Sequence, residues 1–326
     1  MEFRTPIDIQ PGLTISHSDK VLMLGSCFTD YVGQKFTESK LNALVNPFGA
    51  LFNPESIAMA IERAIDNIQV TDNDIFQYRG LWSSFGFHGS FSSTSKDDAL
   101  QKMNASICKA HDWIKGTSLL FLTFGTAYVY RDTGDGKVVA NCHKLPGDRF
   151  VREMLSAEAI AERFHDLAKR LLGINPDMKI VLTVSPVRHL RDGAHQNQIS
   201  KSTLLLAIDK LAGCLDCVHY FPSYEIMMDD LRDYRFYDAD MVHPSPLAVE
   251  YIWQRICDTC FSKDELSLID EISRIESAVR HRPLNPDTDE FRQFAEKQKS
   301  AVEKLASLHP EIDLTSELDH WKSLLL

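Results

Sequence analysis

Two nucleophile candidates, Ser26 and Cys27, lie side by side in the segment VLMLGSCFTD. Four apolar residues lead into Gly25, and a helical pattern follows at once, so we expect Ser26 where a buried strand ends and a helix begins. Glycine lets the chain turn sharply at that point. Backbone N–H groups at the start of a helix favour negative charge, and they would stabilise an oxyanion on a bound carbonyl group.

A serine hydroxyl needs a base to take its proton, and the segment YDADMVHPSP contains a candidate. Asp240 and His243 are three residues apart, just before a predicted helix. Within one turn a carboxylate can orient an imidazole and stabilise its protonated form. The alternative is an aspartate that caps a turn and a surface histidine. Because a serine ends a predicted strand, we favour catalysis, with Ser26 as nucleophile, Asp240 as orienting acid and His243 as base.

Cysteine chemistry is a weaker interpretation. A thiolate of Cys27 at a helix N-terminus would be activated, but its side chain should point away from that of Ser26, so we favour a packing role. Seven cysteines spread over the chain suit reduced thiols. Two Cys-x-x-Cys pairs, 214–217 and 257–260, match zinc spacing, yet their wide separation favours buried thiols. No metal and no organic cofactor is predicted.

Short apolar runs alternate with helical patterns over most of the chain. Unbroken apolar runs are typical of strands buried on both faces of a parallel sheet. Strand and helix in alternation predict a doubly wound α/β sheet, in which ligands bind beyond the carboxyl ends of the strands. The predicted strands are residues 20–25, 118–125, 179–186 and 217–223, and the predicted helices between them include 53–69 and 156–173.

The sheet pattern stops near residue 262. Residues 262–282 and 288–310 read as charged amphipathic helices, the first with a capping box from Ser262 to Glu265. We therefore divide the chain into a catalytic domain, 1–262, and a C-terminal helical extension, 263–326. The extension is expected to pack on the sheet domain or to join subunits of a homo-oligomer.

Composition indicates an ordinary globular protein, with 326 residues of which 44% are hydrophobic. A net charge of −11 argues against binding nucleic acid through its phosphates. No segment approaches the roughly 18 apolar residues of a membrane span, and the N-terminus lacks a basic start followed by an apolar run. We expect a cytoplasmic protein with no nucleic-acid or membrane partner.

Several motifs in one order resemble those of the GSCFA domain family, a branch of the SGNH/GDSL-like hydrolases. The resemblance implies a flavodoxin-like three-layer α/β/α sandwich with a central parallel sheet, and ester hydrolysis through a serine acyl-enzyme. It places Ser26 in the first block and Asp240 and His243 in the last, and it makes Gly49 a glycine whose amide helps to bind the oxyanion. The motifs are GSCF at 25–28, NPFG at 46–49, FGTAYVY at 124–130, NCHKLP at 141–146 and DMVHPS at 240–245.

One block departs from the SGNH pattern. These enzymes usually carry Gly-x-Asn-Asp, whose asparagine donates to the oxyanion, but here Gly125 and Thr126 occupy the region. Thr126, or Asn141 from the next loop, is the expected replacement. His143 lies in the same loop, a turn-rich insert over residues 131–148 that reads as a hairpin or an active-site loop. It either contacts an anionic or hydroxylated substrate group or is a solvated loop residue. His88 lies among aromatic and small polar residues that suggest a pocket wall.

The sequence therefore predicts a serine-dependent esterase acting on a small-molecule or saccharide ester, with deacetylation of a carbohydrate or metabolite as one expected reaction. One alternative is a carbohydrate- or metabolite-binding protein with a degenerate hydrolase site. Another is a structural interaction protein assembled through its helical tail. Arg188 and His189 follow a predicted strand, and they are either cleft residues or an exposed cationic turn.

Overall fold

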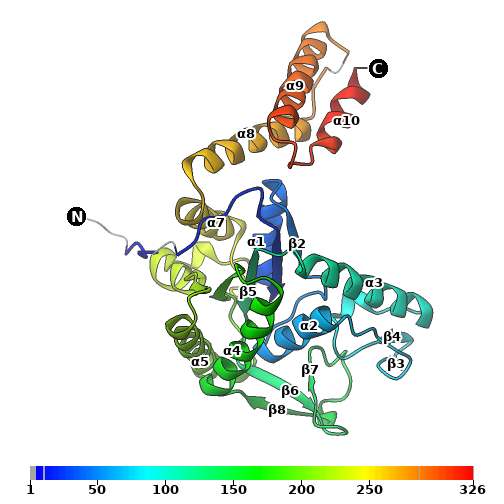
Figure 1. Cartoon of the computed structure of the whole chain (residues 1–326), viewed down its shortest axis with the longest axis vertical. Helices are drawn as coiled ribbons and strands as arrows, with labels where there is room; N and C mark the ends of the chain where they lie inside the picture. Colours follow the sequence, from blue (N-terminus) through cyan, green and yellow to red (C-terminus); the bar gives the residue numbers. More distant parts are fainter. Residues whose placement is uncertain (1–4, 10–11, 286, 326) are drawn as a thin grey trace.

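A five-stranded parallel sheet forms the centre of the molecule (Figure 1). The computed structural model describes residues 5–9, 12–285 and 287–325. Numbered by their order along the chain, the parallel strands lie side by side as 2-1-3-4-5, which is the flavodoxin-like arrangement. From one edge to the other they are β2 (Ala43–Val45), β1 (Val21–Gly25), β5 (Leu119–Phe124), β9 (Lys179–Val184) and β10 (Val218–Tyr220).

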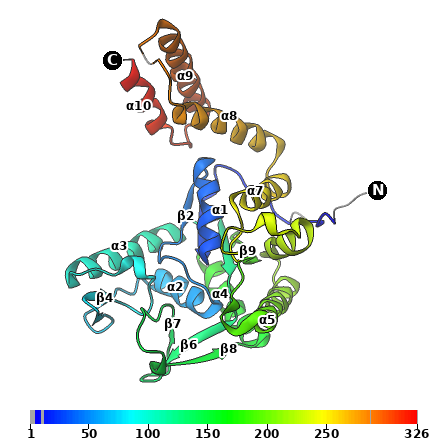
Figure 2. The ribbon, with the colours of Figure 1, turned by 180° about the vertical axis from the view of Figure 1, so that it is seen from behind.

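The helices cover both faces of the sheet, as Figures 1 and 2 show from opposite sides. Side chains alternate between the faces, so Leu22 and Leu24 of β1 belong to one apolar cluster and Val21 and Met23 to another. The first cluster is completed by α2 (Pro54–Asp66), α3 (Lys96–Ile114), α4 (Ala157–Ile174) and α5 (Gly193–Cys214), and the second by α1 (Cys27–Glu38) and α7 (Pro246–Cys260). This confirms the predicted three-layer α/β/α architecture.

Helix starts follow the capping signals in the sequence. The side chain of Asn53 accepts from the N–H of Ser56, and Pro54 opens α2. Ser262 caps the following helix, α8 (Lys263–Arg280), by accepting from the N–H of Glu265. Both predicted helix starts are confirmed.

Short helical turns complete the element list. They are α6 (Ser223–Glu225), a π-helical segment (Ile226–Leu231) and the 3-10 turns Gly89–Phe91, Gly147–Arg149, Leu190–Asp192 and Tyr234–Phe236.

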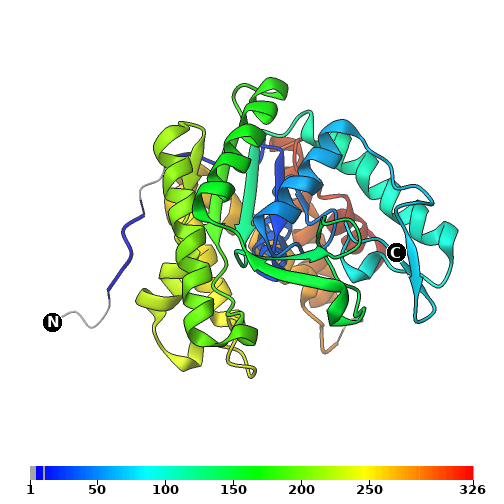
Figure 3. The ribbon, with the colours of Figure 1, turned by 90° about the horizontal axis from the view of Figure 1, so that it is seen from below.

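Small antiparallel elements follow the parallel strands. A hairpin is formed by β3 (Phe76–Tyr78) and β4 (Leu81–Ser83), and a three-stranded sheet by β6 (Tyr128–Asp132), β7 (Val138–Val139) and β8 (Phe150–Met154). Because β6 begins soon after β5 ends, this sheet extends from the carboxyl edge of the central sheet (Figure 3). The turn-rich insert predicted as a hairpin or active-site loop is thus the segment that links β6, β7 and β8.

The C-terminal helices stand at the end of the molecule opposite to β6 and β8 (Figure 1). They are α8 (Lys263–Arg280), α9 (Asp289–Leu308) and α10 (Thr315–Leu324), and they share an apolar cluster around the buried Trp321. Ile269 of α8 also packs into the core formed by α1 and α7. Two of these helices were predicted, whereas α10 was not. The division at residue 262 and assembly through these helices stay predictions.

No helix within the described ranges is both long and apolar enough to pass through a lipid bilayer.

Candidate functional site at the carboxyl edge of the sheet

Ser26 lies where β1 ends and α1 begins, as predicted. It is the N-cap of α1, and its Oγ accepts from the N–H of Phe28 at 3.4 Å. Ser26 is fully buried. The turn depends on Gly25, because a methyl group there would lie 2.4 Å from the carbonyl oxygen of Thr123. The hydroxyl therefore holds the start of a helix and is close to the ends of neighbouring strands.

Asp240 and His243 form a hydrogen-bonded pair. Asp240 Oδ2 lies 2.6 Å from His243 Nδ1, and Oδ1 accepts from the N–H groups of Val242 and His243, each at 2.9 Å. The bonds from the His243 N–H, the His243 ring and the Val242 N–H lower the pKa of Asp240 to about 2, so the carboxylate is ionised at neutral pH. Because Nδ1 of His243 is occupied, Nε2 is the nitrogen left for proton transfer.

Ser26 and the Asp240–His243 pair lie at the same edge without a hydrogen bond between Ser26 and His243 in the described part of the chain. Tyr31, in α1, is close to both groups. Burial and then the charges of Cys27, Asp238 and Asp240 raise the pKa of its phenol. The predicted pair is thus formed, and it lies near the first turns of the helix that Ser26 caps.

A second histidine, His189, lies close to Gly125, as Ser26 does. A methyl group at Gly125 would lie 3.3 Å from Ser26 Cβ, 3.3 Å from His189 Nε2 and 2.8 Å from the carbonyl oxygen of Phe52. Only glycine fits between these groups. Nε2 of His189 is buried and has no hydrogen-bond partner among the residues that the structure describes. The sequence placed His189 at a strand end but did not identify this contact.

Lys201 of α5 lies fully buried behind Gly125. Its Nζ donates to the carbonyl oxygens of Gly125 at 2.7 Å and Ser185 at 2.6 Å, which follow β5 and β9 directly. Burial lowers the pKa of Lys201 to about 7. Sequence reasoning missed this residue. The available signal was its helical register with Leu204 and Ile208, which places a lysine on the buried face of α5.

The expected oxyanion donors have hydrogen-bond partners within the protein, and their role in binding an oxyanion stays a prediction. The N–H of Ser26 donates to Thr123 at 3.3 Å, and the N–H of Gly49 donates to the carbonyl oxygen of Asn46 at 2.8 Å. The hydroxyl of Thr126 lies 3.1 Å from Ser200 Oγ, and it also accepts from the N–H of Tyr128. The N–H of Gly49 is therefore used within the protein, whereas either hydroxyl of the Thr126–Ser200 pair can be the donor.

Asn141, His143 and His88 hold loops in place. Asn141 Oδ1 accepts from the N–H of His143, and His143 Nε2 lies 2.8 Å from the carbonyl oxygen of Ser84. Nδ1 of His88 lies 3.1 Å from Ser90 Oγ, and a methyl group at Gly49 would lie 2.3 Å from His88 Cβ. These contacts give all three residues structural roles, and substrate contact by them stays a prediction.

A groove of about 440 Å³ runs beside the Asp240–His243 turn. The N–H of Arg188 donates to the carbonyl oxygen of Val242 at 3.3 Å, which joins one wall of the groove to the turn. The groove combines thioether, phenol and guanidinium groups, so it suits a ligand with both apolar and polar parts. Its walls include Arg188, Leu190, Met228, Arg232, Tyr237 and Met241.

All seven cysteines are free thiols, and burial raises the pKa of five of them. Cys27 is half-buried, and burial is the main reason why the pKa of its thiol is raised, which opposes an activated thiolate. Cys257 is buried, and its pKa rises to about 12. Cys214 is exposed, so the prediction of buried thiols was wrong there. Within the described residues, no three His, Cys, Asp or Glu side chains gather as a metal site would require.

The strand order and the polar groups at the carboxyl edge define a doubly wound α/β protein with its candidate site beyond β1, β5 and β9. The chain belongs to the GSCFA family: the GSCFA family model matches residues 20–256, and that of the C-terminal domain of GSCFA domain proteins matches residues 272–326. The sequence resemblance to this family is confirmed.

No curated protein shows a significant match to the chain. Two solved structures are similar over 78% of it. One is a carbohydrate esterase family 3 from Talaromyces cellulolyticus, with 10% identity, a TM-score of 0.34 and 99% of that chain covered. The other is an acetyl xylan esterase from the rumen bacterium Butyrivibrio proteoclasticus, with 11% identity, a TM-score of 0.37 and 66% of that chain covered. Likenesses this distant assign no reaction.

Proposed function

We propose that the protein is a serine-dependent ester hydrolase. The observation that carries the proposal is the hydrogen bond of 2.6 Å between the ionised Asp240 and His243 Nδ1, at the sheet edge where Ser26 follows β1. A carboxylate bound to Nδ1 fixes the ring and stabilises its protonated form, so Nε2 can act as the base. A serine without such a base is not reactive.

The proposed reaction has two steps. Nε2 of His243 takes the hydroxyl proton as Ser26 Oγ attacks the ester carbon, and the carbonyl electron pair moves to oxygen. The intermediate then collapses, the C–O bond to the alcohol breaks, and the leaving oxygen takes the proton from His243. Water attacks the acyl-enzyme by the same proton transfers and releases the acid. Ser26 and His243 have no mutual hydrogen bond, so the mechanism requires the Asp240–His243 turn to approach Ser26 when substrate binds.

The substrate in this proposal is a small-molecule or saccharide ester. The groove lined by Met241, which is two residues before His243 in the chain, provides space for the part of the ester away from the reacting carbon. Tyr237 and the guanidinium groups of Arg188 and Arg232 can hydrogen-bond hydroxyl or carboxylate groups there, while the methionines contact apolar parts.

A binding protein with a degenerate hydrolase site is the second candidate. It is favoured by the fully buried Ser26, whose hydroxyl caps α1 and lies unbonded to His243 among the described residues. In this case the serine would matter for helix capping alone.

A fluorophosphonate probe separates the two candidates. Covalent labelling of the wild type that is absent in Ser26→Ala supports the hydrolase. Ser156→Ala is the matched control, because Ser156 caps α4 in the same way and loss of either cap costs on the order of 1 kcal/mol. No labelling of the wild type, combined with thermal stabilisation by a saccharide, would favour the binder. A panel of short-chain esters and acetylated sugars would then define the substrate.

A further inference from the structure

We propose that His189 donates a hydrogen bond from Nε2–H to the substrate carbonyl oxygen as negative charge develops on it. This inference rests on the proposed hydrolase function. His189 is not part of the Asp240–His243 pair, and its role is separate from that of the base.

The position of His189 follows from the strand order. It lies five residues beyond β9, which pairs with β5, and β5 pairs with β1. The carboxyl ends of these three strands therefore bring His189, Gly125 and Ser26 into one row. Nε2 of His189 and Cβ of Ser26 each lie 3.3 Å from the point where a side chain at Gly125 would begin. The edge of the His189 imidazole therefore lies near a carbonyl group that Ser26 attacks.

The protein holds the His189 side chain in place, but no described residue forms a hydrogen bond with its Nε2 atom. The N–H of His189 donates to Asn197 Oδ1 at 2.8 Å, and its ring stands edge-on to Phe52 at 6.0 Å between centroids. Nε2 itself is buried without a partner in the described residues. A buried polar atom left unpaired costs on the order of 1–3 kcal/mol, and such atoms are uncommon in folded proteins. A ligand oxygen at this position would satisfy it.

The surroundings keep the imidazole neutral. Burial, and then the charges of Lys201, His243 and Arg152, lower the pKa of His189 to about 3. A base with so low a pKa would take a proton from serine poorly at neutral pH, whereas a neutral imidazole can still donate its N–H. The two histidines therefore divide the work, with His243 moving the proton and His189 stabilising the oxyanion. The N–H groups of Ser26 and Gly49 already have carbonyl partners, so this donor is needed.

The test compares two substitutions with different hydrogen-bonding capacity. His189→Phe keeps a planar ring against Phe52 but has no N–H, whereas His189→Gln can place an amide N–H close to the original Nε2. We expect His189→Phe to lower kcat roughly 100-fold with little change in KM, and His189→Gln to recover about a tenth of the wild-type rate. His195→Phe, at an exposed position on α5, is the matched control.

Second-order rate constants for fluorophosphonate labelling of Ser26 give a second readout, since the phosphonyl oxygen occupies the oxyanion position. Thermal unfolding confirms that the variants are folded. Equal rates in the wild type and His189→Phe would overturn the inference, as would equal losses of rate in His189→Phe and His189→Gln. Loss of the acid limb of the pH–rate profile in His189→Phe would also overturn it, because His189 would then be the base. Failure of the wild type to label Ser26 would overturn the proposed function and this inference together.

Discussion

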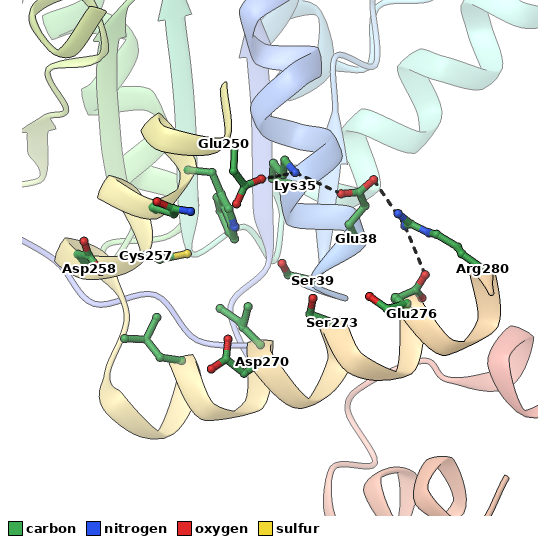
Figure 4. A pocket seen from close by; sticks show the side chains of 15 residues that line it. Lys35, Glu38, Ser39, Glu250, Cys257, Asp258, Asp270, Ser273, Glu276 and Arg280 are labelled. Atoms are coloured by element: carbon green, nitrogen blue, oxygen red, sulfur yellow. Dashed lines mark hydrogen bonds and ion pairs between the residues drawn. The ribbon is translucent and has the colours of Figure 1, made fainter. Parts of the chain in front are cut away.

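The two ends of α1 differ in how their surrounding polar groups are paired. At the start, next to Ser26, the buried hydroxyls of Thr29 and Thr123 and the His189 nitrogen lack partners within the described residues. The other end is about 18 Å away, given the helical rise. There a cavity of about 440 Å³ separates α1 and α7 from α8, and ion pairs cross its walls (Figure 4).

Ion pairs at the second end connect the helices. Lys35 lies 2.6 Å from Glu250 of α7, and Arg280 of α8 lies 3.5 Å from both Glu38 and Glu276. Such partly exposed pairs contribute little individually.

Glu317 Oε2 and Trp321 Nε1, in the C-terminal helices beyond the second end of α1, are also buried without partners among the described residues, so unpaired groups alone do not distinguish the two ends. The first end differs because its unpaired groups surround Ser26 at the carboxyl edge of the sheet, where ligands bind in folds of this kind. The first end is expected to control activity, and the second to control how the C-terminal helices pack.

Among substitutions near the start of α1, Asp240→Asn should have the largest effect on kcat. The asparagine oxygen can still accept from the N–H groups of Val242 and His243, so the turn is kept. The charge that stabilises the His243 imidazolium is lost, and we expect kcat to fall about 1,000-fold or more. Steady-state ester hydrolysis measures this. Asp238→Asn, in the same turn, is the control and should keep wild-type activity; equal losses in both variants would contradict the proposed role of Asp240.

Gly125→Ala should have the next largest effect. Its methyl group would lie 2.8 Å from the carbonyl oxygen of Phe52 and 3.3 Å from both Ser26 and His189, so the backbone must shift. We expect kcat to fall roughly 100-fold, because small misplacements of reacting groups are costly, and stability to fall by about 1–3 kcal/mol. Gly147→Ala is the control, since nothing lies within 4 Å of its added methyl group. If Gly125→Ala keeps the wild-type kcat, the close packing of Ser26, Gly125 and His189 is not needed for the reaction.

Lys201→Met probes the buried amine through pH. The native pKa of about 7 is below the ordinary lysine pKa of 10.5, so between these pH values the unfolded chain holds a proton that the native chain has lost. Wild-type stability should therefore rise with pH across this window, by up to about 1.4 kcal/mol per unit relative to Lys201→Met. Urea unfolding at pH 7, 8 and 9 measures the difference. Lys210→Met, exposed on the same helix, should keep the wild-type slope; a parallel response in Lys201→Met would mean that Lys201 stays protonated.

Local sequence signals predicted much of the fold. The unbroken apolar runs gave four of the five parallel strands, and the caps at Asn53 and Ser262 gave two helix starts. The short edge strand Ala43–Val45 was missed because three residues carry too little periodicity to distinguish a strand. Helix α10 was also missed, since it is short and lacks a side-chain cap at its start.

The candidate site was predictable where its chemistry is local. Asp240 and His243 are three residues apart, so their spacing already indicates a pair. The contact of Ser26 with Gly125 and His189 depends on which strands are neighbours, and no local pattern encodes that order. Lys201 was missed for a similar reason, because its partners are carbonyl oxygens of other strand ends rather than side chains.

Lys40→Met tests the second end of α1 and should have the smallest effect. Lys40 lies between Glu276 of α8 and Glu317 of α10, and without it the partly buried carboxylate of Glu276 and the buried carboxylate of Glu317 repel each other. Burial and then Glu317 raise the pKa of Glu276, so acidification neutralises it first and relieves the repulsion. We expect Lys40→Met to lose about 1 kcal/mol at pH 8 and less at pH 5, with ester hydrolysis unchanged. Calorimetry at both pH values measures the loss, and Lys322→Met, whose lysine lies 4.0 Å from Asp319, is the control. If activity falls with stability, the two ends of α1 are coupled, and the separation of an active end from a packing end is wrong.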